Sequence, residues 1–214
     1  MKTCKLLREQ VAAATGSKKA ELVLKNAQIV NVFTQSVETG DIAIEGGYIV
    51  GIGNYEGITE KDLGGAYVCP GFLDGHIHIE SSMTSPGEFE RAVVPHGTTA
   101  VITDPHEIAN VAGTAGIRFM MQAAQKLDLD VYFMLPSCVP ATDLDESGAE
   151  LLARDLEPFY ADEKVLGLAE MMNAFGVTHG DKGCFEKLVQ ARSLKKAIDG
   201  HAPALSGKEL NAYV

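Results

Sequence analysis

Two histidines one residue apart directly follow an apolar run, and this junction constrains the fold more than any other part of the chain. The run Tyr67–Gly75 leads into His76-Ile77-His78. Side chains at positions i and i+2 of a β-strand point to the same face, so both imidazoles can reach one cation. Imidazole suits first-row metal ions, and such an ion can generate hydroxide from water near neutral pH. An isolated H-x-H is more often a pair of surface or hydrogen-bonded histidines, so the metal interpretation depends on further ligands downstream.

Composition and charge limit the class of protein. The chain has 214 residues, enough for one large domain or for one domain plus a small one, and 46% of them are hydrophobic. The formal net charge is -11, and no cluster of Lys and Arg interrupts the acidic balance. Binding to nucleic-acid phosphates or to an anionic membrane surface is therefore not expected.

Cysteine usage and the absence of targeting segments indicate a cytoplasmic protein. The four cysteines are scattered and form no C-x-x-C pair, which argues against a zinc ribbon or a thioredoxin-type motif and fits a reducing compartment. Residues 1–19 lack the long apolar core of a signal peptide. No apolar run in the sequence is long enough to span a membrane.

The first third of the chain predicts a helical segment followed by a small all-β accessory unit. Within residues 1–19, positions 4–14 suit a short helix closed by Gly16. Residues 20–66 have the β pattern, and Gly46-Gly47 separates two β-runs at 42–45 and 48–52. Two glycines between two such runs are a strong signal for a two-residue hairpin.

Strands and helices alternate after residue 66. Near-continuous apolar runs predict strands that end at His78, Thr103, Leu135, Ala169 and Asp199. Helices are expected at about 86–96, 114–127, 148–160 and 185–193, and Ser206-x-x-Glu209 is a capping box for one more. Met120 and Met121 are interpreted as core residues. Five such units predict a parallel sheet.

The residues that could carry chemistry all follow strands. They are His76, His78, His106, Glu107, Glu170 and His201. Active sites of (β/α)8 barrels lie at the carboxyl ends of the strands. A doubly wound sheet also uses this edge, usually with a glycine-rich first turn that is absent here. We therefore expect an α/β fold, an incomplete (β/α)8 TIM-type barrel of strands one to five over residues 67–214.

A binuclear metal site is predicted from these strand ends. His76 and His78 would bind one ion, His201 a second, and Glu170 would bridge them, because a carboxylate can join two cations about 3.5–4 Å apart. Alone, Glu170 would be a solvated or paired carboxylate and His201 a structural histidine. Four candidate ligands at three strand ends favour the metal interpretation. Their N and O donors suit divalent Mn, Fe or Zn.

Other catalytic signatures are incomplete. Residues 106–110 begin like H-E-x-x-H but have Asn110 at the second histidine position, which excludes a zincin. Residues 78–80 match the H-x-E half of a cytidine-deaminase zinc site, but no P-C-x-x-C follows. The sequence contains no G-x-S-x-G elbow and no G-x-G-x-x-G phosphate loop, and His96 and His179 are assigned no role.

The segment Pro70–His78 resembles the first-strand motif of the amidohydrolase superfamily, and residues 20–66 resemble the small accessory domain of that superfamily. Within it, the motifs are most similar to those of the bacterial-type adenine deaminases. The similarity extends over almost the whole chain from about Ala20. Besides the first strand, the segments that carry it are 76–82, 104–111, 135–142, 169–173 and 199–203.

The resemblance implies hydrolytic deamination of adenine to hypoxanthine and ammonia, in purine salvage or catabolism. It implies divalent metals, Mn or Fe with Zn also suitable, held by His76, His78, Glu170 and His201, that activate water for attack at C6 of the base. His106 and Glu107 are the catalytic candidates for contacting the purine or assisting proton transfer. The full-length protein is expected to be a homo-oligomer.

Two departures from the superfamily pattern matter. Many members carry a carbamylated lysine on strand four, where this chain and the adenine deaminases have Glu170. Members also continue well beyond Val214, with strands six to eight and a proton-transfer aspartate, so we expect an N-terminal fragment. Two alternatives stay open, namely another amidohydrolase that acts on a cyclic amide and a metal-binding fragment without catalysis.

Overall fold

A computed structural model describes residues 3–142 and 144–214. The chain divides into two compact units, of which one ends at Pro70 and the other begins at Gly71. The first two residues of the predicted helical segment 1–19 lie outside the described part. No helix among the described residues is long and apolar enough to cross a membrane.

From residue 3 on, where the description begins, the smaller unit contains one helix and a five-stranded sheet. Helix α1 (Cys4–Ala14) has the predicted bounds and begins where the Thr3 side chain accepts a hydrogen bond from Leu6 N. The strands pair in the order β3-β2-β1-β4, and β5 also pairs with β1. They are β1 (Ala20–Asn31), β2 (Ser36–Glu45), β3 (Tyr48–Gly53), β4 (Gly57–Asp62) and β5 (Tyr67–Val68).

The predicted hairpin between β2 and β3 is confirmed. Glu45 pairs with Tyr48 in antiparallel register, so the loop consists of Gly46 and Gly47 alone. Both glycines have positive φ, +57° and +77°, a conformation that side chains with a Cβ rarely adopt. A turn of this kind requires φ > 0 at both central positions, which explains the Gly-Gly pair.

The apolar run 67–78, interpreted as one strand, is divided in two. Tyr67 and Val68 pair with β1 in the small sheet, whereas the first strand of the larger unit is β6 (Phe72–Ile77). Pro70 lies between them, and because proline has no N–H it is disfavoured inside a paired strand. The break separates the two sheets.

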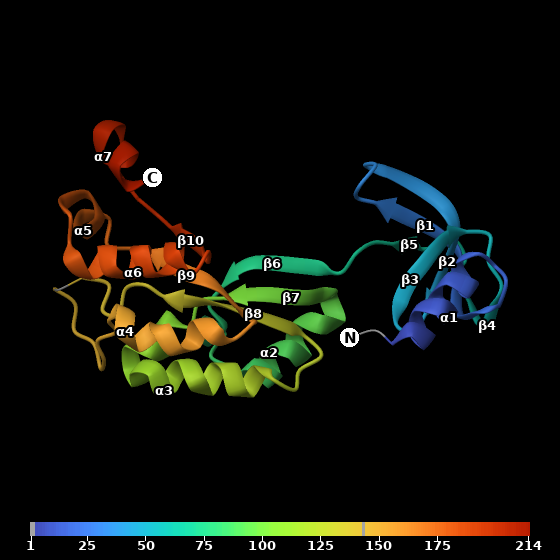
Figure 1. Ribbon diagram of the computed structural model, residues 1–214, viewed down its shortest axis with the longest axis horizontal. Coiled ribbons are helices and arrows are strands. Elements are labelled where there is room, and N and C mark those ends of the chain that lie inside the picture. Colours follow the sequence, from blue (N-terminus) through green and yellow to red (C-terminus); the bar gives the residue numbers. More distant parts are fainter. Residues whose placement is uncertain (1–2, 143) are drawn as a thin grey trace. The chain divides into compact units, whose positions relative to one another are not determined.

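The larger unit is built on a sheet of five parallel strands (Figure 1). Its spatial order is β6-β7-β8-β9-β10, the same as the order in the sequence. A doubly wound sheet reverses direction at a switch point, whereas a barrel adds each strand beside the previous one. After β6 the strands are β7 (Thr98–Thr103), β8 (Asp130–Pro136), β9 (Val165–Met171) and β10 (Ala197–Gly200).

Helices cover one face of this sheet (Figure 1). Val101 and Leu168 of the strands and Ile117 and Met120 of a covering helix are buried together in the core, as predicted for Met120. These helices are α2 (Pro86–Val93), α3 (His106–Ala124), α4 (Ala153–Leu156) and α6 (Lys182–Ser193). Three short 3₁₀ helices are η1 (Ile79–Ser82), η2 (Val94–His96) and η3 (Glu157–Ala161).

The predicted helix 148–160 is wrong over its first half. Only α4 and η3 are helical, because Gly148 N donates to Asn110 O at 2.8 Å and Leu151 N donates to Val139 O at 2.9 Å. These long-range bonds hold the segment as a loop, and sequence periodicity cannot predict them.

Two smaller differences lie near the C-terminal end. Helix α5 (Ala174–His179) was not predicted. Helix α7 (Gly207–Tyr213) follows Ser206 as expected, but the Ser206 side chain makes no capping hydrogen bond, so the capping box is wrong.

Helix α3 begins at His106, eight residues before the predicted start at Thr114, and is kinked at Gly113. The φ and ψ of Gly113, 57° and -141°, lie in a region that is essentially restricted to glycine. A Cβ at this position would also lie 3.2 Å from Ala149 Cβ. The kink sets the direction of the short first part, residues 106–112, which begins with His106.

Gly113→Ala is expected to destabilise the chain by about 1–3 kcal/mol, because alanine would have to adopt this strained conformation. Gly87→Ala is the matched control: Gly87 lies in α2, and an added Cβ would meet only Leu127 Cδ2 at 3.9 Å. That change should be neutral or stabilising by up to about 1 kcal/mol. Urea unfolding of both variants measures the difference, and equal stability of the two would contradict the strain argument.

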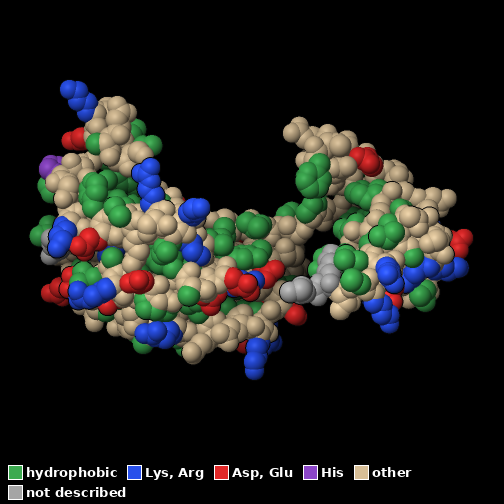
Figure 2. Space-filling model, in the orientation of Figure 1, with side chains coloured by type: hydrophobic (Ala, Val, Ile, Leu, Met, Phe, Trp, Pro, Cys, Tyr) green, Lys and Arg blue, Asp and Glu red, His purple; other side chains and the backbone are tan. Residues whose placement is uncertain are grey.

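The two outer strands of the larger sheet are open. Phe72 and Leu73 of β6 are 60% and 61% exposed, and Ile198 of β10 is 41% exposed. Hydrophobic side chains accordingly reach the surface over β6 (Figure 2). Among the described residues, β6 pairs in this sheet only with β7, and β10 only with β9.

Candidate metal centre

The carboxylate of Glu170, on β9, lies at the centre of a cluster of four histidines. Its side chain is 14% exposed. Its Oε1 lies 3.0 Å from His76 Nε2 and 3.4 Å from His201 Nδ1. Its Oε2 lies 3.6 Å from His78 Nε2 and 3.5 Å from His106 Nδ1. The structure thus brings together the four residues expected as ligands and adds His106, which was expected only as a catalytic candidate.

His76 and His78 present ring nitrogens to the same point. Their Nε2 atoms are 3.2 Å apart, and the rings meet edge to face with centroids separated by 4.9 Å. This is the geometry expected for side chains two positions apart at a strand end. Both nitrogens can coordinate an ion only when they are unprotonated.

A hydrogen bond fixes the tautomer of His78. Its Nδ1 lies 2.8 Å from the carbonyl oxygen of Asp104, and because a carbonyl can only accept, Nδ1 carries the proton. In the neutral ring, Nε2 is then free and faces the cluster. Metal-binding histidines commonly use their second nitrogen in this way.

Asp104 is a further member of the cluster that is not among the ligands predicted from the sequence. It follows β7, is 1% exposed, and its Oδ2 accepts from His106 Nδ1 at 3.0 Å. Burial raises the pKa of Asp104, and the hydrogen bond to Asp104 raises the pKa of His106. The signal that identified Glu170, a carboxylate directly after an apolar strand, also applies to Asp104.

Glu107, at the start of α3, and Glu80, on η1, lie beside the cluster. Glu107 Oε1 accepts from Ser81 Oγ at 2.6 Å, so this catalytic candidate is turned toward η1. Glu80 Oε1 accepts from Ile108 N at 3.2 Å, and burial raises the pKa of Glu80. These bonds tie the segment after β6 to the segment after β7.

Strands on both sides hold the main chain of Glu170. Glu170 N donates to Asp199 Oδ1 of β10 at 2.6 Å, and Glu170 O accepts from Ser137 Oγ, directly after β8, at 2.7 Å. The register between β9 and β10 shifts at this level. The carboxylate therefore projects from a backbone that is fixed at both its donor and its acceptor.

The donor set fits a divalent cation. His78, Asp104, His106 and Glu170 offer donor atoms that all lie within 4.8 Å of one another. Within the described part of the chain, Asp104 Oδ1 is buried without a hydrogen-bond partner. Imidazole nitrogens and carboxylate oxygens suit Zn, Fe and Mn. An ion among them would use lone pairs that protein donors leave unpaired.

Comparison with known proteins places these residues in a family. Residues 67–214 match the amidohydrolase family. Adenine deaminase 2 of Carboxydothermus hydrogenoformans is 55% identical over 210 residues, which are 98% of this chain and 36% of that protein. The adenine deaminase of Bacillus pumilus is 52% identical over 208 residues, or 97% of this chain and 36% of the relative. The chain thus spans about a third of the length of these relatives.

Solved structures confirm the α/β fold class. N-isopropylammelide isopropylaminohydrolase of Burkholderia multivorans matches with a TM-score of 0.55 at 19% identity, covering 89% of this chain and 55% of that protein. N-acyl-D-glutamate deacylase of Bordetella bronchiseptica, solved with zinc, matches with a TM-score of 0.52 at 16% identity, covering 91% and 55%. At these identities the likeness concerns the fold alone.

Proposed function

The chain belongs to the amidohydrolase family, and we propose that its residues form part of the active site of an adenine deaminase, which hydrolyses adenine to hypoxanthine and ammonia. The observation that carries the proposal is the convergence of four histidines on the Glu170 carboxylate at 3.0–3.6 Å. It occurs in a chain that is 52–55% identical to relatives named adenine deaminases.

We propose His76, His78, Glu170 and His201 as ligands of one or two divalent ions, Mn or Fe, with Zn as the alternative. When bound, such ions lower the pKa of water and stabilise negative charge that develops on the substrate. The chain's own residues position the ligands: the Asp104 carbonyl holds the proton of His78 on Nδ1 and leaves Nε2 free.

The proton-transfer roles are proposed for His106 and Glu107. Asp104 orients His106 by accepting from its Nδ1, which turns the ring toward the cluster. A side chain held in this way can pass a proton to the leaving amine. Glu107, whose Oε1 accepts from Ser81 Oγ at 2.6 Å, is proposed to contact the purine or to assist proton transfer.

The remaining features of the proposal concern partners and location. The substrate is adenine, a small molecule, and the whole protein is a homo-oligomer in the cytoplasm. The net charge of -11 supports the absence of a nucleic-acid partner. The names of the relatives at 52–55% identity favour adenine over a cyclic amide as substrate.

A chimera tests the activity. Residues 1–214 would be joined at the matching position to the remaining part of the Bacillus pumilus relative, which is 52% identical over the shared region. With Mn²⁺ we expect conversion of adenine to hypoxanthine, and we expect His76→Asn in the chimera to abolish it, which would make the activity dependent on this chain. Hydrolysis of hydantoin or dihydroorotate without turnover of adenine would contradict the proposal. The intact relative is the positive control.

A further inference from the structure

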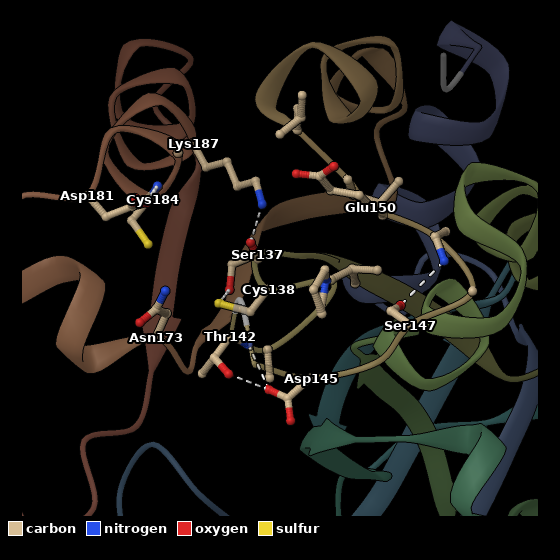
Figure 3. Close-up of a pocket in the computed structure, with 18 residues that line it drawn as sticks. Ser137, Cys138, Thr142, Asp145, Ser147, Glu150, Asn173, Asp181, Cys184 and Lys187 are labelled. Carbon is tan, nitrogen blue, oxygen red and sulfur yellow. Dashed lines mark hydrogen bonds between the residues drawn. The ribbon is translucent and has the colours of Figure 1, made fainter.

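A buried lysine is connected to Glu170 through two hydrogen bonds. Lys187, on α6, is 8% exposed, and its Nζ donates to Ser137 O at 2.6 Å (Figure 3). The hydroxyl of the same serine donates to Glu170 O at 2.7 Å. The connection therefore runs from helix α6, across the residue that follows β8, to the main chain of Glu170.

The environment of Lys187 is unfavourable for a lysine placed only for stability. Burial lowers its pKa, and no carboxylate forms a salt bridge with it in the part of the chain that the structure describes. The buried cysteines Cys138 and Cys184 line the same cavity as the ammonium group (Figure 3). Burying an ammonium without an ion partner costs several kcal/mol, so an apolar residue would serve stability better.

The space beside Lys187 is a cavity of about 500 Å³ that is separate from the histidine cluster. Ser137, Cys184 and Lys187 line it, together with Glu150 and Asn173 (Figure 3). Lys187 points from its helix across this space to the Ser137 carbonyl. The cavity leaves room for a larger side chain at this position.

We propose that Lys187 is a positioning residue that acts through Ser137 to fix the main chain of Glu170, and thereby the carboxylate at the centre of the histidine cluster. The inference rests on the proposed metal role of Glu170. Lys187 holds Ser137 at its carbonyl, and Ser137 holds Glu170 with its hydroxyl. Loss of the serine hydroxyl frees the Glu170 carbonyl, and loss of the lysine amine frees the serine that binds it. Groups that orient metal ligands in this way typically change metal affinity about 10–100-fold.

Lys196 provides a matched control. Its Nζ also donates to a main-chain carbonyl, that of Val165 in β9, at 2.5 Å. Val165 is at the start of β9, however, whereas Glu170 is near the end of that strand. Lys196→Met therefore removes the same kind of bond at the opposite end and should lower stability without changing metal affinity.

The experiment measures Mn²⁺ affinity of the chain by calorimetry and folding by circular dichroism. Lys187→Met is expected to weaken Mn²⁺ binding about tenfold, and Ser137→Ala should do the same because it removes the second bond of the connection. Lys187→Arg, which restores a donor to Ser137 O, should bind within about threefold of the wild type. A merely structural lysine would alter the melting temperature and leave the affinity unchanged.

Each outcome decides between the proposals. Wild-type affinity in folded Lys187→Met and Ser137→Ala would overturn the positioning role and leave the metal site intact. If Lys187→Met does not fold, Ser137→Ala alone decides, since it removes only a hydroxyl. A wild-type chain that binds no Mn²⁺ would instead overturn the metal site that the proposed function requires.

Discussion

Glu170→Gln is expected to weaken Mn²⁺ binding to the chain by at least about 100-fold, with the fold retained. The glutamine is nearly the same size, so packing on β9 and both main-chain bonds of residue 170 should persist. It removes the negative charge toward which four histidine nitrogens converge at 3.0–3.6 Å, and it replaces one acceptor oxygen by an NH₂ group that cannot bind a cation. Calorimetric titration of Mn²⁺ into metal-free protein measures the change.

The control for this variant is Glu157→Gln, at an exposed position on η3, which should bind Mn²⁺ like the wild type. Circular dichroism spectra of the three proteins should coincide. If Glu170→Gln binds Mn²⁺ within threefold of the wild type, the carboxylate of Glu170 is not a bridging ligand. The metal would then be assigned to His78, Asp104 and His106, whose donor atoms lie close together without Glu170.

The sequence was most informative where chemistry and periodicity coincide. An apolar run ending in a polar ligand type predicts both a strand and the edge at which its side chain emerges. The parallel order of the strands therefore puts the ends that carry His76, Glu170 and His201 at the same edge of the sheet. Asp104 satisfies the same rule, since it directly follows the apolar strand β7.

The residues that sequence could not reveal act through the backbone of distant segments. Ser137 reaches Glu170 through a hydroxyl bond to a carbonyl 33 positions away, and Lys187 reaches Ser137 across 50 positions. Neither belongs to a motif of metal ligands. Likewise, the kink at Gly113 and the loop before α4 follow from tertiary bonds and a special backbone conformation, on which the local pattern carries no information.

The polypeptide of residues 1–214 alone is expected to bind Mn²⁺ yet to deaminate adenine at less than about a thousandth of the rate of the chimera. Its metal candidates all lie in or directly after strands of one sheet, so binding needs only the described strands and the residues that follow them. Catalysis also requires a pocket that excludes water and holds the base. Here both outer strands are open, with Phe72, Leu73 and Ile198 exposed.

Closure of a (β/α)8 barrel places further strands between these two edges, and their loops form part of the site. Open edges also favour association of chains, which makes concentration a necessary variable in the assay. Hypoxanthine formation would be followed by chromatography, at equal Mn²⁺ occupancy, for the polypeptide and the chimera over a tenfold range of concentration. Turnover within tenfold of the chimera would show that the five-stranded sheet suffices for catalysis. A rate that rises with the square of the polypeptide concentration would show instead that two copies associate and complete the site for each other.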